Sequence, residues 1–495
     1  MSVARYIPIT NSLMARAIAV GILLSTVAST SAETLHESIA PEAARADLSA
    51  LYMGLKSAHY DLYSNRSQQE YDEQFQKQLQ SLVTPVTGLE LWQLLQRFAA
   101  FGNVAHARID FPTDVYGEFR ENGGKAFPIY LRIVDERAYV SENFSGVDAV
   151  SAGDEILAID DVPMNEWLDR TAGYISADTP YIAHSQLEAG FPMYLWLELG
   201  ERESYVLKLR KNNNRAMDIK IPGLTYDELQ TSISSAPEYF SLDYNSRDAR
   251  VLAECIAYLR PGPFYNVENP EHLWNTAAFV KFLDASFEEF LEAGATSLII
   301  DLRNNPGGDN SFSDPMVAWI ADRPFSFASK FLVRSSDEAA ASNQTRLAGN
   351  PDAAESVSAR YAIAFENTPP GEVFEFDIPM AEPRDSARFE GDVYVLVNRN
   401  SYSNAVSVAA ILKDYGWGTV AGEETADFAT TYGAMEHFTL PQTGLRVAFP
   451  KAYIIRPSGD ARPGGVKPDI LINTPIAPST EDVVLQELVS AIEEE

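Results

Sequence analysis

The chain has 495 residues, of which 46% are hydrophobic and 11% aromatic, so it can bury a sizeable core. Its length predicts roughly three domains. Its 70 acidic residues outnumber its 38 basic ones, which gives a formal net charge of −32. Because such a charge repels phosphates, the composition argues against nucleic acid and against anionic membrane surfaces as partners.

The first 32 residues have the pattern of a secretory signal peptide. Arg5 and Arg16 supply positive charge, residues 17–28 form an apolar run, and residues 30–32 suit cleavage. The apolar run is shorter than the ~20 residues that span a bilayer, so we expect cleavage rather than a membrane anchor. Cleavage leaves 36 basic and 70 acidic residues, a net charge of −34, in a periplasmic or secreted protein without stable membrane insertion.

Residues 33–111 are predicted to form a helical N-terminal region. Apolar residues recur at helical spacing in two groups, one starting at Leu48 and the other at Leu91. Before residue 100, only Pro41 and Pro85 interrupt this stretch.

Residues 112–222 change to short strand-like runs and are predicted to form a PDZ-like β domain. Residues 151–163 resemble the PDZ signature, with a glycine-aspartate turn, a strand, a tight acidic turn and a second strand. PDZ domains bind extended peptides at a sheet edge, and the alternative here is a domain that only packs against its neighbours. The aromatic segment from Tyr174 to Leu197 is long enough to reshape or cover such a groove.

The remainder of the chain is predicted to contain a linker, an α/β core and a C-terminal helix. Residues 223–247 are polar and rich in serine, as in a linker. Over residues 248–478, strand-like runs alternate with helical patterns, the order typical of buried parallel strands. Residues 334–390 are expected to be an inserted or loop-rich region, and residues 479–495 a helix.

The cysteine and histidine content predicts neither a disulfide nor a metal site. Cys255 is the only cysteine, so no intramolecular disulfide exists, and its apolar neighbours predict a buried structural thiol. The six histidines are scattered, and neither a metal motif nor a phosphate or dinucleotide fingerprint occurs. We therefore expect no cofactor.

Two turns, each after an apolar strand-like run, carry the residue types of acyl-transfer chemistry. Residues 398–405 place Ser403 at the start of a helical pattern that ends before Gly416. A serine at such a turn is exposed, and helix-start N–H groups stabilise negative charge beside it. In the other turn, residues 301–308, Gly307 and Gly308 free backbone N–H groups to face a ligand.

Four motifs occur in the order of a known family: residues 298–308, the Ser403 turn with its helix, residues 419–425 and residues 464–469. With the helical start and the PDZ-like segment, they resemble the serine peptidase family of carboxy-terminal processing proteases, tricorn core protease and the chlamydial secreted protease. The resemblance covers nearly the whole mature chain. It implies a multidomain α+β fold with a helical N-terminal region, a PDZ-like β domain and an α/β core of ClpP/crotonase-like spiral type.

The resemblance implies that Ser403 is the nucleophile, with Ser401 as its rival two residues earlier. One branch of the family activates the serine with a lysine about 25 residues later, and this chain has Phe428 there. Lys413 lies ~15 Å along the helix, too far to reach back. Geometry does not exclude Lys451, which matches no family motif.

The histidine branch of the family carries its base just before the PDZ domain, where this chain has His106. Imidazole titrates near neutral pH and suits a general base. His437 is the second candidate for this role, and its β-like neighbours favour a structural side chain.

The group that orients the base departs from the family pattern. Members with a histidine carry a glutamate three residues before a glycine-valine step, where this chain has Arg462, so Asp460 is the nearest candidate carboxylate. The serine that precedes the histidine in tricorn is Ala105 here. For the oxyanion, the resemblance implies an N–H group from Gly307 or Gly308, with Gly308 favoured, and the N–H group of Asn404.

The sequence thus predicts a secreted or periplasmic serine endopeptidase that acts on peptides or unfolded proteins. Because of the Arg462 and Ala105 departures, a catalytically impaired member that binds peptide or an apolar ligand is the alternative. An esterase or acyl-transfer enzyme on the same core is a third interpretation. The sequence carries no signal for an oligomeric state.

Overall fold

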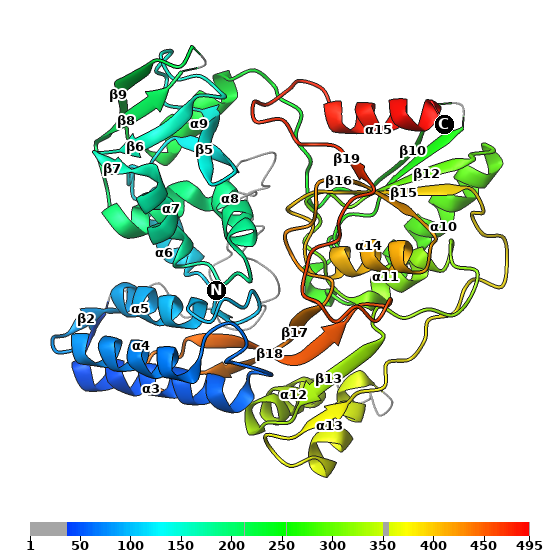
Figure 1. Cartoon of the computed structure of the whole chain (residues 1–495), viewed down its shortest axis with the longest axis horizontal. Coiled ribbons are helices and arrows are strands. Elements are labelled where there is room, and N and C mark those ends of the chain that lie inside the picture. Colours follow the sequence, from blue (N-terminus) through cyan, green and yellow to red (C-terminus); the bar gives the residue numbers. More distant parts are fainter. Residues whose placement is uncertain (1–36, 212, 254, 350–355, 495) are drawn as a thin grey trace, which may run out of the picture.

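The computed structural model describes residues 37–211, 213–253, 255–349 and 356–494 (Figure 1). In this part of the chain, thirteen α-helices and four β-sheets form a mixed α/β multidomain protein, as predicted. The predicted signal peptide lies outside the described residues. No helix within the described ranges combines the length and apolar character needed to cross a membrane.

The N-terminal region is helical, as the apolar spacing predicts. Two of its helices begin with a capping box, in which Ser67 pairs with Glu70 and Thr87 with Glu90. The elements are β1 (Ser38–Ile39), α3 (Pro41–Ala58), α4 (Gln68–Ser81), β2 (Val86–Thr87), α5 (Gly88–Ala100), β3 (Arg108–Ile109) and α6 (Thr113–Glu121).

A separate antiparallel sheet follows, with strand order β4-β5-β6-β8-β9 and β7 beside β6. The predicted aromatic insertion forms a helix, α8, which packs against the edge strand β4. Residues 226–235, within the predicted linker, form another helix because Thr225 and Glu228 make a capping box. The elements are β4 (Ile129–Val134), β5 (Arg137–Asn143), β6 (Glu155–Ile159), β7 (Val162–Pro163), α7 (Met164–Ala172), α8 (Pro180–Leu199), β8 (Ser204–Arg210), β9 (Ala216–Pro222) and α9 (Tyr226–Ser235). The assignment of this sheet region as a PDZ domain stays a prediction.

The α/β core in the C-terminal half of the chain, called the rear core below, is built on a six-stranded sheet of order β10-β11-β12-β15-β16-β19. All neighbouring strands in it are parallel except β10 and β11. Alternate residues of its strands pack on α10, α11 and α14 on one face and on α15 on the other (Figure 1). The predicted order of helix and then buried strand is confirmed by α10 and β12. The elements are β10 (Asp248–Ala253), β11 (Ile256–Arg260), α10 (Ala277–Glu292), β12 (Ser297–Asp301), α11 (Asn310–Val317), β15 (Asp392–Val397), α14 (Asn404–Asp414), β16 (Thr419–Gly422), β19 (Ile470–Leu471) and α15 (Val483–Glu493).

The buried thiol predicted from the run around Cys255 is wrong. Cys255 is exposed, because a turn splits this apolar run into the strands β10 and β11.

The region of residues 334–390, which the sequence predicts to be inserted or loop-rich, contains secondary structure. Its elements are β13 (Lys330–Arg334), α12 (Asp337–Gly349), α13 (Val357–Asn367) and β14 (Val373–Glu375).

A long hairpin joins the rear core to the N-terminal helices. Its strands β17 (Thr431–Thr439) and β18 (Arg446–Ile455) run from the core across to α3 and α5 (Figure 1). At the far end, Asp47 on α3 accepts the N–H groups of Gln442 and Thr443 at 2.8 and 2.9 Å. β18 also pairs antiparallel with β3, with Val447 opposite Ile109. The chain segment that follows α5 is thereby fixed against the core.

A buried ion cluster attaches α12 to this hairpin. Glu436 on β17 is fully buried and accepts hydrogen bonds from Lys451 of β18 and Arg346 of α12, each at 2.5 Å. Burial alone would raise the pKa of Glu436, but the two cations outweigh it and lower the pKa to about 2. Lys451 is therefore a structural partner of Glu436 in this arrangement.

We predict that Glu436→Gln destabilises the fold by about 3–5 kcal/mol, because it leaves Lys451 buried without a counter-ion. Urea denaturation measures the loss. The same contribution should disappear from the wild type as the pH falls from about 4.5 towards about 2, because Glu436 then takes up a proton. Glu166→Gln is the matched control, since it breaks an exposed pair with Arg170 and should cost less than about 1 kcal/mol. Equal effects of the two substitutions would contradict the prediction.

Candidate active site

Ser403 lies at the turn between β15 and α14 and has a strained backbone. Its φ of 53° and ψ of −123° are rare for a residue with a side chain, and such conformations cost ~1–3 kcal/mol. Two sets of hydrogen bonds hold it there. Its N–H group donates to Asp427 Oδ2 at 2.6 Å, and its carbonyl oxygen accepts from the N–H groups of Val406 and Ser407.

The two candidate serines have different environments. Ser401 is fully buried, and its Oγ donates to the carbonyl oxygen of Leu302 at 2.8 Å and accepts from the N–H group of Asn398 at 3.1 Å. Ser403 is only partly buried, and its hydroxyl has no hydrogen-bond partner among the described residues. Ser401 therefore holds the turn together, and Ser403 is the serine whose hydroxyl is free.

The glycine turn lies directly against the serine turn. Gly307 has a φ of 85°, and a Cβ atom there would lie 2.7 Å from the nitrogen of Asn404 and 2.8 Å from the Cβ of Ser403. Only glycine fits this approach. The N–H group of Gly307 already donates to Asn305 Oδ1 at 2.9 Å, so it is not free for an oxyanion. Those of Gly308 and Asn404 have no partner in the part of the chain that the structure describes.

His106 lies beside the residue that precedes Ser403. Its ring stacks on that of Tyr402, with centroids 5.7 Å apart and planes at 26°. The imidazole is buried, and its Nδ1 has no partner within the described ranges. Burial lowers the pKa of His106 to about 4, although Asp178 and a backbone hydrogen bond with Tyr432 act in the opposite direction. The imidazole is therefore neutral at neutral pH and able to accept a proton.

Two carboxylates complete the site, Asp427, which is buried, and Asp178, which is half-buried, and the sequence analysis identified neither. Asp178 Oδ2 accepts the N–H group of Ala105 at 3.1 Å. Burial raises the pKa of Asp178 to about 6, with His106 opposing this shift and Asp427 adding to it. Burial likewise raises the pKa of Asp427 to about 6. Asp427 precedes Phe428, the position compared with the family lysine, whereas no local pattern marks Asp178.

The structure does not bring Asp460 to His106. Asp460 follows β18, and its two carboxylate oxygens accept hydrogen bonds from Arg462 at 2.9 and 2.7 Å. These bonds hold the pKa of Asp460 well below its usual range. The acid that interacts with the His106 imidazole is Asp178, from the segment before α8, rather than the nearest carboxylate to Arg462 in the sequence.

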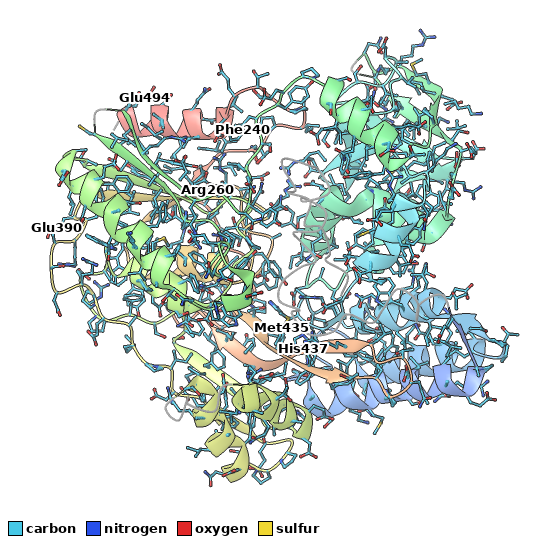
Figure 2. All side chains as sticks on the ribbon, turned by 180° about the vertical axis from the view of Figure 1, so that it is seen from behind. Phe240, Arg260, Glu390, Met435, His437 and Glu494 are labelled. Atoms are coloured by element: carbon cyan, nitrogen blue, oxygen red, sulfur yellow. The ribbon has the colours of Figure 1, made fainter. Side chains whose placement is uncertain are left out.

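The other candidate bases lie in different surroundings. His437 is on β17, opposite Ala448 in the hairpin, and its pKa is lowered to about 4 by burial and by neighbouring arginines (Figure 2). Lys413 donates to the carbonyl oxygen of Lys467 and to Asp469. Neither residue makes a hydrogen bond with the Ser403 turn.

A cavity of about 410 Å³ opens beside Tyr402 and Asp427, and neither Ser403 nor His106 is among the residues that line it. Its walls come from the helical region, from the sheet region of residues 129–222 and from the rear core. They include Ala105, Arg108, Glu188, Asn304, Tyr402 and Asp427.

A buried charge cluster joins the serine turn to the edge strand β4. Arg399, four residues before Ser403, pairs with Glu188 of α8 at 2.8 Å and with Glu423 at 3.3 Å. Arg132 of β4 pairs with the same two acids at 2.9 and 2.6 Å. All four side chains are at most 9% exposed. Glu188 and Arg399 also bind the N–H group and carbonyl oxygen of Ile133, a residue of β4.

Comparisons with known proteins bear on the family and the fold of the chain. Residues 272–472 match the model of peptidase family S41. The structure of mature CPAF complexed with lactacystin aligns with a TM-score of 0.61 at 16% identity, over 92% of this chain and 97% of that chain. Mature CPAF alone gives 0.59 at 16% identity, over 92% and 96%. Identities this low show a shared fold. No curated protein sequence matches the chain.

The family match, together with a strained serine beside a glycine turn, defines a serine-type peptidase. Within this class, residues 272–472 form a domain of peptidase family S41, which confirms the resemblance found in the sequence.

Removal of the hydroxyl group should lower the stability of the fold at Ser401 and leave it nearly unchanged at Ser403. Ser401→Ala should destabilise the fold by about 1–3 kcal/mol, because it leaves the buried N–H group of Asn398 without its partner. Ser403→Ala should change the free energy of unfolding by less than about 0.5 kcal/mol, because its hydroxyl bonds nothing. Urea denaturation of both variants measures this difference. A stable Ser401→Ala beside a destabilised Ser403→Ala would reverse the assignment of the two hydroxyl groups.

Proposed function

We propose that the protein is a periplasmic or secreted serine endopeptidase that hydrolyses peptides or unfolded proteins through an acyl-enzyme on Ser403, with His106 as general base. The observation that carries this proposal is the stacking of His106 on Tyr402, which brings an imidazole next to the Ser403 turn from a segment about 300 residues earlier. A neutral imidazole and a free hydroxyl are the two groups that serine hydrolysis requires.

In the proposed reaction, the Ser403 hydroxyl attacks the scissile carbonyl carbon while His106 accepts the hydroxyl proton. The N–H groups of Gly308 and Asn404 donate to the oxyanion of the tetrahedral intermediate, and the start of α14 adds favourable potential. The imidazolium then protonates the leaving amine. Water attacks the acyl-enzyme by the same steps, which returns Ser403 and His106 to their starting states.

Asp178 takes the role for which the sequence suggested Asp460. Its carboxylate acts on the imidazole and raises the pKa of His106 against the effect of burial. The N–H group of Ala105 holds this carboxylate, so the residue at the position of the tricorn serine contributes through its backbone. An anionic Asp178 stabilises the imidazolium that forms when His106 takes the serine proton.

A fluorophosphonate probe tests the nucleophile. It should label the wild type and spare Ser403→Ala, and β-casein should be cleaved only by the protein that is labelled. His106→Ala should lower kcat by at least ~10²-fold, because general-base catalysis is lost. His437→Ala is the matched control and should retain the wild-type rate. Equal labelling of the wild type and Ser403→Ala would refute the site. Ligand binding without cleavage would favour an impaired, ligand-binding member of the family.

The pH dependence of kcat tests the role of Asp178. The carboxylate supports His106 only when ionised, so the wild-type rate should rise as the pH increases through about 6. We expect Asp178→Asn to lower kcat by about tenfold above pH ~7 and to match the wild type below pH ~5, where Asp178 is protonated. Asp460→Asn, measured in parallel, should leave the profile unchanged. A constant ratio between wild type and Asp178→Asn at every pH would exclude this role.

A further inference from the structure

Asp427 is a buried acid that the proposed reaction does not use. It is 1% exposed, and its Oδ2 accepts the N–H group of Ser403 at 2.6 Å. Its Oδ1 is also buried and has no hydrogen-bond partner among the described residues. A buried carboxylate oxygen without a donor is costly, and native structures rarely leave one without a function.

Neighbours other than Ser403 fix the position of Asp427. Thr425 Oγ1 donates to the carbonyl oxygen of Asp427 at 2.9 Å and accepts from the N–H group of Val466 at 2.9 Å. On either side, Ala426 and Phe428 pack on the hydrophobic core of the sheet region of residues 129–222. The backbone of Asp427 is thus held by the α/β core and by the sheet region of residues 129–222. The Asp427 carboxylate holds the strained backbone of Ser403 by accepting its N–H group.

Among the described residues, the N–H groups of Ser403 and Phe428 both act to lower the pKa of Asp427, but only that of Ser403 forms a hydrogen bond with the carboxylate, through Oδ2. Besides Asp427, two charged groups act on the neighbouring Tyr402: Asp178, which is an acid and offers no donor when ionised, and Arg108, which pairs with Asp110 at 3.4 Å. Asp427 also lines the cavity described above, together with Tyr402 and Ala426. Because Oδ1 is buried in the free protein, a donor that enters this cavity reaches it only when neighbouring side chains move.

We infer that Asp427 is a substrate-binding residue: Oδ2 holds the Ser403 N–H group, and Oδ1 accepts a backbone N–H group of the bound peptide. This inference takes its ligand, a peptide, from the function proposed above. One carboxylate would then set the nucleophile and the substrate backbone relative to each other, which is the positioning that acyl transfer requires. Esters without a neighbouring N–H group would lack this contact.

A binding experiment on Ser403→Ala, which cannot form an acyl-enzyme, tests the inference without turnover. The probes are a short capped peptide from β-casein and the same peptide N-methylated at one backbone amide at a time. Calorimetry should find one amide whose methylation weakens binding by about 10- to 100-fold, the loss expected for a hydrogen bond to a charged group. In Ser403→Ala/Asp427→Asn, the parent peptide should bind more weakly and methylation of that amide should have little further effect.

Ser403→Ala/Asp47→Asn is the matched control, because Asp47 is also a buried acid that accepts backbone N–H groups, at the far end of the hairpin. It should keep the full methylation effect. Ser403→Ala/Asp427→Ala is the second variant should Asp427→Asn fold poorly. The inference is overturned if no amide matters in Ser403→Ala, or if its methylation costs as much after Asp427 is replaced. If the methylation effect depends on Asp427 but the wild type cleaves nothing, the inference stands and the proposed hydrolysis fails.

Discussion

The antiparallel pairing of β3 with β18 is the contact on which the proposed site depends. It has only two residue pairs, Arg108 with Ala448 and Ile109 with Val447, yet it fixes the chain two residues beyond His106 to a hairpin of the rear core. Because Val447 and Phe449 also pack among the N-terminal helices, the pairing is part of a shared hydrophobic core. The imidazole therefore reaches the Ser403 turn on a rigid support rather than on a free loop.

The electrostatics of the site follow from its burial. Enclosing the His106 imidazole disfavours its cation and keeps it neutral, whereas enclosing Asp178 and Asp427 disfavours their anions. The site thus holds a base and two weak acids in a small volume. The strain of Ser403 is maintained by hydrogen bonds to both of its backbone polar groups and by the adjacent Gly307, so these contacts offset the cost of the strained backbone that leaves the hydroxyl free.

Sequence reasoning predicted what local patterns determine. The apolar runs gave β12 and β15, the helical spacing gave α10 and α14, and the serine and glycine turns lie together as the family resemblance implied. Sequence reasoning failed where a residue interacts with a partner far away in the chain, or where a short turn interrupts an apolar run. Asp178 acts on His106 across 72 positions of sequence, and no spacing rule connects them. Cys255 sits in a turn that its apolar neighbours conceal.

The charge cluster of Arg132, Glu188, Arg399 and Glu423 has a consequence for behaviour in salt. Its two cations and two anions are enclosed, so mobile ions screen their attraction far less than they screen pairs at the surface. A chain with a formal net charge of −32 repels itself in dilute buffer, and added electrolyte relieves that repulsion. Rising ionic strength should therefore leave the association of the β4 strand with the serine turn nearly unchanged, while it weakens ion pairs at the surface.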